Sequence, residues 1–311
     1  MTGRPPAELV ARSGSAEAPV ELAGSLWLPD GDAAALLVMH PGSGPSDRDN
    51  DVFFPPIRAA LLRAGVAVAS FDKRGVGRST GSWQEVGIEE QAADLGAALE
   101  AAAARVPDVP AGIFGHSQGG WVALEASRRG SPAPAFVVTS SGPAVPVLEQ
   151  ERSSARSAVA ALPAADREAA YATADAVLTL AEDGAPFADL VAWVAAHPAG
   201  TRTLARAWGD AAEITEEEWT HLVRLGRYDP VPALRGLAVP LLAVFGEADT
   251  VTPVAASVAV LRREVVPRLL TTVVLPGGDH RMGATAGGAF VPGYPDVVVA
   301  FALDAAARRA R

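Results

Sequence analysis

The sequence predicts an α/β fold: a mostly parallel twisted sheet with helices on both faces and an inserted helical lid. Three observations support this prediction. Short apolar runs of strand length alternate with helical stretches along most of the chain. A Gly-rich pentapeptide at 115–119 lies between one such run and a helix. Residues 144–228 interrupt the alternation with successive helical stretches and contain no strand-like apolar run.

Strands are expected where apolar runs end at turn residues. Residues 1–18 are polar and contain Pro and Gly, so they form either a loose arm or the first edge strand. The run at 33–39, AAALLVM, is typical of a sheet that is buried on both faces. The full set of expected strands after the arm is 21–28, 33–39, 66–71, 111–114, 135–139, 240–245 and 269–275.

Helices are expected between these strands and throughout the interruption. Those of the alternating part are expected at 57–63, 88–104, 121–126, 254–265 and 295–307. Those of the interruption are expected at 151–161, 165–182, 187–196, 200–209 and 215–225. Thr215 and Glu218 form a capping box for the last of these.

A helical insertion in an alternating chain is typical of a lid over the carboxyl edge of the sheet. The alternative is a helical pack that only adds stability. We therefore expect residues 1–143 and 229–311 to form the core, and residues 144–228 to form the lid.

Composition restricts the classes of function. The chain has 311 residues, of which 49% are hydrophobic, enough for a large core. A net charge of −10 argues against nucleic acids and anionic membranes as partners. The absence of cysteine excludes thiol catalysis and disulfides. No signal peptide or long apolar run is visible, so we expect a cytoplasmic location; the sequence does not indicate an oligomeric state.

The pentapeptide G-H-S-Q-G predicts a nucleophilic serine, Ser117. Between a strand and a helix, G-x-S-x-G forms a turn so tight that its serine is strained and exposed above the sheet. Gly115 and Gly119 lack a Cβ atom, so the strand and the helix can approach closely. The helix N-terminus favours a developing oxyanion, and we expect the backbone amide of Gln118 to be one of its donors.

A second Gly-rich loop, residues 40–50, follows the strand expected at 33–39. Such a loop presents backbone N–H groups at the carboxyl edge of the sheet, where a second oxyanion donor is needed. We expect the amide of Ser43 to fill this role, with Gly44 as the neighbouring alternative. His40 lies at the start of the loop and is interpreted as a structural or substrate-pocket residue.

Two other motifs are not interpreted as ligand sites. The D-x-D-x-D spacing at 47–51 resembles a calcium loop, but Val52 and Arg58 occupy the positions that need Gly and Glu. A salt-bridged or hydrogen-bonded loop is expected there instead. The glycines at 72–79 do not fit G-x-G-x-x-G, because Thr80 replaces the third glycine. No metal and no cofactor is therefore expected.

A serine nucleophile needs a base, and the base needs a carboxylate to orient it. The loop after the strand at 240–245 carries Glu247 and Asp249. Asp249 lies in the loop proper and is preferred, with Glu247 as the alternative. His280 follows the last strand and is the only histidine downstream of Asp249, so it is the expected base. Its neighbour Asp279 is expected to serve the loop.

On these residues the chain resembles the α/β-hydrolase superfamily. The loop at 42–49, the turn at 72–79 and the acid loop at 246–249 are similar to bacterial dienelactone-hydrolase-like and prolyl-oligopeptidase-like serine hydrolases. The resemblance extends from about residue 20 to the C-terminus, except for the lid. Pro41 departs from the pattern and leaves open which amide, of Ser43 or of Gly44, completes the oxyanion hole.

The resemblance and the Ser117, Asp249 and His280 triad predict a serine hydrolase. Its expected substrate is a small or medium carboxylic ester or thioester. Because the nucleophile is Ser instead of Cys or Asp, dienelactone hydrolysis proper and dehalogenation are disfavoured. The alternatives are an aminopeptidase-like activity, acyl transfer or perhydrolysis with the same triad, or a ligand-binding protein without catalysis.

The lid carries three tryptophans, Trp193, Trp208 and Trp219. Their large apolar surfaces either wall an acyl pocket and bind substrate, or form the core of the lid. His197 and His221 also lie in the lid and are interpreted as solvated or satisfied in place.

Overall fold

A computed structural model describes residues 5–129, 133–283 and 289–309 and contains an eight-stranded sheet. The strands are β1 (Ala7–Gly14), β2 (Pro19–Trp27), β3 (Ala35–His40), β4 (Val66–Phe71), β5 (Ala111–His116), β6 (Val137–Ser140), β7 (Leu241–Gly246) and β8 (Leu270–Leu275). Their order across the sheet is β1-β2-β4-β3-β5-β6-β7-β8. Strands β3 to β8 are mutually parallel, whereas β1 and β2 run antiparallel to their neighbours. The prediction of a mostly parallel sheet is confirmed.

The N-terminal segment forms the edge strand β1, which is one of the two alternatives expected for it. β1 pairs with β2 in an antiparallel ladder from Ala7 opposite Leu26 to Gly14 opposite Pro19. Leu9 and Ala11 are buried, whereas their neighbours Glu8, Val10 and Arg12 are exposed. This period of two is that of a strand with one face on the core.

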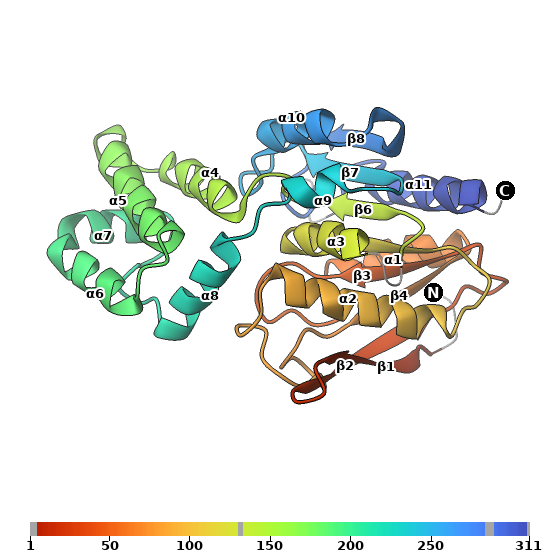
Figure 1. Cartoon of the computed structure of the whole chain (residues 1–311). Coiled ribbons are helices and arrows are strands. Elements are labelled where there is room, and N and C mark those ends of the chain that lie inside the picture. The colour runs from red at the N-terminus through yellow and green to blue at the C-terminus, as the bar shows by residue number, and fades with distance from the viewer. Residues whose placement is uncertain (1–4, 130–132, 284–288, 310–311) are drawn as a thin grey trace.

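Helices cover both faces of the sheet, as expected (Figure 1). They are α1 (Phe54–Arg63), α2 (Ile88–Ala103), α3 (Gln118–Arg129), α9 (Val231–Arg235), α10 (Val254–Glu264) and α11 (Tyr294–Arg309), with a short 3-10 helix η1 (Pro267–Leu269). Leu36 and Val38 of β3 pack in one hydrophobic cluster with residues of α2 and α3. Leu37 and Met39 point to the other face and pack with α1 and α11. Burial on both faces explains the continuous apolar runs of the central strands.

Between β6 and α9 the chain forms five helices, which gather beyond one end of the sheet (Figure 1). They are α4 (Val147–Val159), α5 (Ala164–Glu182), α6 (Phe187–Ala196), α7 (Pro198–Ala205) and α8 (Glu216–Gly226). They enclose two small hydrophobic clusters of their own. The predicted capping box at Thr215 is present at the start of α8.

Two contacts place these helices at the carboxyl ends of the parallel strands. His221 of α8 is hydrogen bonded to the carbonyl of Gln84, in the segment that follows β4. The side-chain amide of Gln150 in α4 donates to the carbonyl of Val251, in the loop that follows β7. Among the described helices, none is long and apolar enough to span a membrane.

Most element boundaries lie within two residues of the prediction, and several differ by three or four. The helix after the pentapeptide begins at Gln118 instead of at 121, because the two glycines at its start carry no apolar signal. Helix α7 ends at Ala205 instead of at 209. Helix α9 was not predicted, since five residues are too few to show a helical period.

Strand β5 depends on a glycine at its centre. A Cβ atom at Gly112 would lie 2.3 Å from the ring of Phe136, which is fully buried. We expect Gly112→Ala to destabilise the protein by about 2 kcal/mol, because the ring must move within a packed core. Urea unfolding measures this difference.

The control is Gly31→Ala, where a Cβ atom would meet nothing within 4 Å. This change should alter stability by less than about 0.5 kcal/mol, as surface substitutions usually do. Equal effects at Gly112 and Gly31 would contradict the packing argument.

Candidate active site

Ser117 occupies a tight turn between β5 and α3. Its φ angle is +53°, in the left-handed region that residues other than glycine rarely adopt. Its backbone N–H donates to the carbonyl of Ser140 at 3.0 Å, which ties the turn to β6. A Cβ atom at Gly115 would lie 1.9 Å from the carbonyl oxygen of Gly119, so only glycine permits this approach of strand and helix.

Three side chains from three loops converge at this turn. His280 Nε2 lies 2.9 Å from Ser117 Oγ, and His280 Nδ1 lies 2.9 Å from Asp249 Oδ2. Because an ionised carboxylate only accepts hydrogen bonds, Nδ1 carries the proton and Nε2 faces the serine as an acceptor. The loops after β5, β7 and β8 thus bring together the three residues that the sequence proposed as a triad.

Asp249 is held as a carboxylate. Its side chain is completely shielded from solvent, and this burial alone would raise its pKa. The hydrogen bond from His280 and those from the backbone N–H groups of Thr252 and Val251 outweigh the burial and hold the pKa below its ordinary value. The group therefore stays ionised at neutral pH beside the imidazole.

Glu247, the alternative acid, lies elsewhere. Its carboxylate accepts from the backbone N–H of Gly277 and has no described contact with His280. Asp279 accepts from the backbone N–H groups of Arg281 and Gly283, so it organises the turn around His280, as expected.

Backbone amides beside Ser117 are free to receive a ligand atom. Within the described parts of the chain, the N–H groups of Gln118, Ser43 and Gly44 donate to no protein acceptor. A Cβ atom at Gly42 would lie 3.4 Å from the Cβ atom of Ser117, so the loop after β3 passes directly over the nucleophile. Gly44, the alternative donor, has a φ angle of +78° at the next bend of the same loop.

A buried lysine fixes this loop from behind. Lys73, in the turn after β4, is 5% exposed. Its Nζ donates to the carbonyl of Gly42 at 2.5 Å, to the carbonyl of Gly44 at 3.3 Å and to Oε1 of Gln118 at 2.9 Å. Sequence reasoning gave this residue no role, although the turn at 72–79 was one of the motifs that carried the resemblance.

A second buried residue that the sequence did not single out is His116. Its Nε2 lies 3.2 Å from the carbonyl oxygen of His280, and its Nδ1 lies 3.0 Å from Asn50 Nδ2. Burial lowers the pKa of His116 to about 3, so the ring is neutral, and it donates from Nε2 while accepting from Asn50. Its position directly before Ser117 in the pentapeptide was the available signal.

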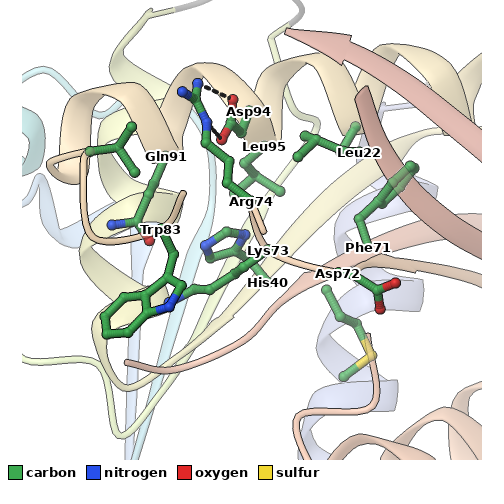
Figure 2. Close-up of a pocket in the computed structure, with 13 residues that line it drawn as sticks. Leu22, His40, Phe71, Asp72, Lys73, Arg74, Trp83, Gln91, Asp94 and Leu95 are labelled. Carbon is green, nitrogen blue, oxygen red and sulfur yellow. Dashed lines mark hydrogen bonds and ion pairs between the residues drawn. The ribbon is translucent and has the colours of Figure 1, made fainter. Parts of the chain in front are cut away.

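His40 lies behind the loop and away from the nucleophile. With Lys73, Trp83 and Gln91 it lines a small cavity under the start of α2 (Figure 2). Its Nε2 is buried and finds no partner among the described residues. Burial, together with the charge of Lys73, lowers the pKa of His40 to about 3. This arrangement supports the interpretation of His40 as a structural residue instead of one that contacts substrate.

The three tryptophans of the helical insertion pack into or against one of its hydrophobic clusters. Trp219 is 1% exposed and donates from Nε1 to the carbonyl of Ala185. Trp193 stacks on the ring of His197, and it packs with Trp208 against the same hydrophobic cluster. Their role in binding substrate remains a prediction.

The acidic loop at 47–51 is salt-bridged, as predicted. Asp47 accepts from two backbone N–H groups of its own loop. Asp49 pairs with Arg58, and Asp51 pairs with Arg281. Among the residues that the structure describes, no group of three or more His, Cys, Asp or Glu side chains could hold a metal ion.

Comparison with known proteins identifies related folds. The family described as serine aminopeptidase, S33 matches residues 49–284. A proline iminopeptidase of Mycobacterium smegmatis aligns over 97% of this chain and 100% of its own, with a TM-score of 0.64 and 21% identity. An esterase of Pyrococcus furiosus aligns over 98% and 91%, with a TM-score of 0.61 and 16% identity.

A thermophilic esterase of Thermogutta terrifontis aligns over 97% of this chain and 100% of its own, with a TM-score of 0.55 and 17% identity. A comparison with curated protein sequences finds no significant match. These likenesses confirm the α/β-hydrolase fold and the resemblance on which the sequence analysis relied.

The contact between Asn50 and His116 can be tested by stability. We expect Asn50→Ala to cost about 1–3 kcal/mol, because it leaves the buried Nδ1 of His116 without a donor. The matched control is Asp51→Ala. Both residues have a positive φ angle, of +46° and +59°, so both alanines carry a similar backbone cost.

Urea unfolding of the two variants isolates the hydrogen bond, since the backbone cost cancels in their difference. If Asp51→Ala is as destabilising as Asn50→Ala, the hydrogen bond to His116 is not what holds this part of the site.

Proposed function

The chain belongs to the serine aminopeptidase S33 family and is an α/β-hydrolase, and from this premise we propose that it cleaves carboxylic esters or thioesters of small to medium size. The observation that carries the proposal is the alignment of Ser117 Oγ, the His280 ring and Asp249, with separations of 2.9 Å at both ends of the imidazole. This is the arrangement that nucleophilic acyl transfer needs. Two of the structurally similar proteins are esterases.

In the proposed mechanism, Ser117 Oγ attacks the acyl carbon while His280 Nε2 accepts its proton. The imidazolium that forms is stabilised by the carboxylate of Asp249, which also fixes the tautomer of the neutral ring. His280 then passes the proton to the leaving alcohol or thiol, which leaves an acyl-enzyme on Ser117. A water molecule that gives its proton to His280 attacks this acyl group, and the acid is released.

The tetrahedral oxyanion of both steps is assigned to the free amides of Gln118 and Ser43. The amide of Gln118 lies at the N-terminus of α3, where the helix dipole also favours negative charge. The Gly42–Ser43 peptide passes over Ser117, which supports Ser43 in preference to Gly44. In other enzymes the loss of one such donor costs about 3–4 kcal/mol of transition-state stabilisation.

The proposal is tested by hydrolysis of p-nitrophenyl esters that range from acetate to long acyl chains. We expect Ser117→Ala to lower kcat by at least about 10⁴-fold with no loss of fold, because the residue provides the attacking oxygen. Asp249→Asn should lower kcat by a similar order, since it destroys the tautomer of His280. The matched control is Glu247→Gln, which should retain most activity.

If the wild-type protein turns over none of the esters, the proposal of an esterase is overturned. Activity that survives in Asp249→Asn and is lost in Glu247→Gln would move the acid to Glu247.

A second candidate function is an aminopeptidase-like activity with the same triad. Besides the family description, one side chain of α4 favours it. Glu151 forms no hydrogen bond or ion pair with any described residue, and burial raises its pKa to about 7. Its neighbour Gln150 contacts the loop of Asp249, so this turn of α4 lies near the acid loop. A substrate ammonium group would provide the missing partner for this carboxylate.

Glu151→Gln distinguishes the two candidates. If Glu151 binds a substrate amine, the variant should lose at least about tenfold in kcat/KM on aminoacyl p-nitroanilides and stay unchanged on p-nitrophenyl acetate. The ratio of wild-type to variant kcat/KM on aminoacyl substrates should also rise with pH through about 7, as Glu151 ionises. Equal rates for wild type and variant on both substrates would exclude this role for Glu151.

A further inference from the structure

Lys73 is a buried charged group with no carboxylate partner. Its Nζ contacts only oxygens of neutral groups: two loop carbonyls and the side-chain amide of Gln118. Among the described residues, no Asp or Glu forms an ion pair with it. A buried and unpaired ammonium is costly, so its retention needs a reason other than stability.

The three acceptors of Lys73 belong to three residues around the proposed oxyanion hole: Gly42, Gly44 and Gln118. The carbonyl of Gly42 and the N–H of Ser43 are part of one peptide group. In a trans peptide these two bonds point in opposite directions, so a hydrogen bond that fixes the carbonyl also fixes the N–H. Lys73 therefore holds the Ser43 N–H on the side of the peptide that faces away from Nζ.

The third acceptor connects Lys73 to the other donor. The side chain of Gln118 bonds Nζ, while the backbone N–H of Gln118 is free at the start of α3. One ammonium group thus connects the loop after β3 to the first residue of α3. We propose that Lys73 is a positioning residue which aligns both amides of the oxyanion hole; this rests on the proposed serine hydrolase function.

The surroundings of Lys73 make this alignment sensitive to pH. Burial lowers the pKa of Lys73 from 10.5 to about 7. The nearby carboxylates are already paired with arginines: Asp72 with Arg48, and Asp94 with Arg74. Figure 2 shows the side chains of Asp72 and Lys73 on opposite sides of the chain. It also shows Asp94, a residue of α2, paired with Arg74.

Two histidines complete these surroundings. His40 at the end of β3 has a pKa of about 3, and burial also lowers the pKa of His221 on α8. Both are neutral near pH 7 and therefore do not stabilise or oppose the charge of Lys73 in the range where it titrates.

Deprotonation removes one of three N–H donors and the charge that strengthens the hydrogen bonds. The neutral amine has two donors for three acceptors, so the alignment weakens and kcat should fall as pH rises through about 7. Stability should change in the opposite direction. The unfolded chain keeps its proton up to pH 10.5, so the contribution of Lys73 to folding becomes more favourable between pH 7 and that value. Unfolding therefore cannot explain an alkaline loss of activity.

The test is the pH profile of kcat and KM on p-nitrophenyl acetate for wild type, Lys73→Met, Gln118→Glu and Arg74→Met. Lys73→Met should lower kcat by about 10- to 100-fold with little change in KM, because the oxyanion forms only after binding. The variant should also lose the alkaline decline. Gln118→Glu places a carboxylate beside Nζ and should move the decline up by about 1–3 pH units.

Arg74→Met is the matched control. Arg74 lines the same cavity and is the next residue in the chain, but it pairs with Asp94 on α2 instead of contacting the loop. This variant should lose stability yet keep kcat and an alkaline decline, which the unpaired Asp94 carboxylate can only move to higher pH. Lys73→Met with wild-type kcat and pH profile would overturn the proposal while leaving the esterase function intact.

The NMR chemical shift of the Ser43 amide gives a readout that does not need activity, because it depends on the orientation and surroundings of the peptide group whose carbonyl Lys73 binds. Loss of Lys73 should move this signal, whereas Arg74→Met should leave it near its wild-type position. If no ester is turned over by the wild type but the signal moves in Lys73→Met, the proposed reaction fails and the positioning role stands. An unchanged Ser43 signal in Lys73→Met would remove the positioning role itself.

Discussion

The rest of the site depends on the close approach of three backbone segments around Ser117. The end of β5, the start of α3 and the loop after β3 come so near one another that a Cβ atom at Gly115 or Gly119 would overlap backbone oxygens. This crowding holds Ser117 at a positive φ angle and leaves the first N–H groups of α3 uncovered. The strain is offset by the packing of a sheet buried on both faces.

The same crowding explains why polar groups are buried behind the nucleophile. A loop that passes over Ser117 turns its carbonyls inward, and buried carbonyls need donors. Lys73 supplies them on one side, and the chain of Asn50, His116 and His280 satisfies the polar groups on the other. His280 and the loop after β3 are therefore each held by a buried polar network.

Features that depend on local pattern were predictable from the sequence. Apolar runs gave the central strands, and the order of Ser117, Asp249 and His280 at successive strand ends gave residues that meet within 3 Å. Lys73, Asn50 and His116 were missed because their partners lie 29 to 164 residues away and no spacing records such pairs. Trp219 shows the converse: its size allowed either a pocket wall or the core of the lid, and its burial, which depends on tertiary packing, favours the core.

The lid and the oxyanion loop are connected through one segment, residues 72–87. At its start Lys73 bonds the loop, and near its end Trp83 and Gln84 contact His221 of α8. A displacement of α8 would act on this segment, because the ring contact and the hydrogen bond join the same histidine to two consecutive residues. The carboxyl end of β4 fixes the segment at its other side through pairing with β3. The position of helices α4 to α8 and the geometry of the loop after β3 are consequently not independent, so in the proposed enzyme substrate size would affect the rate of chemistry as well as binding.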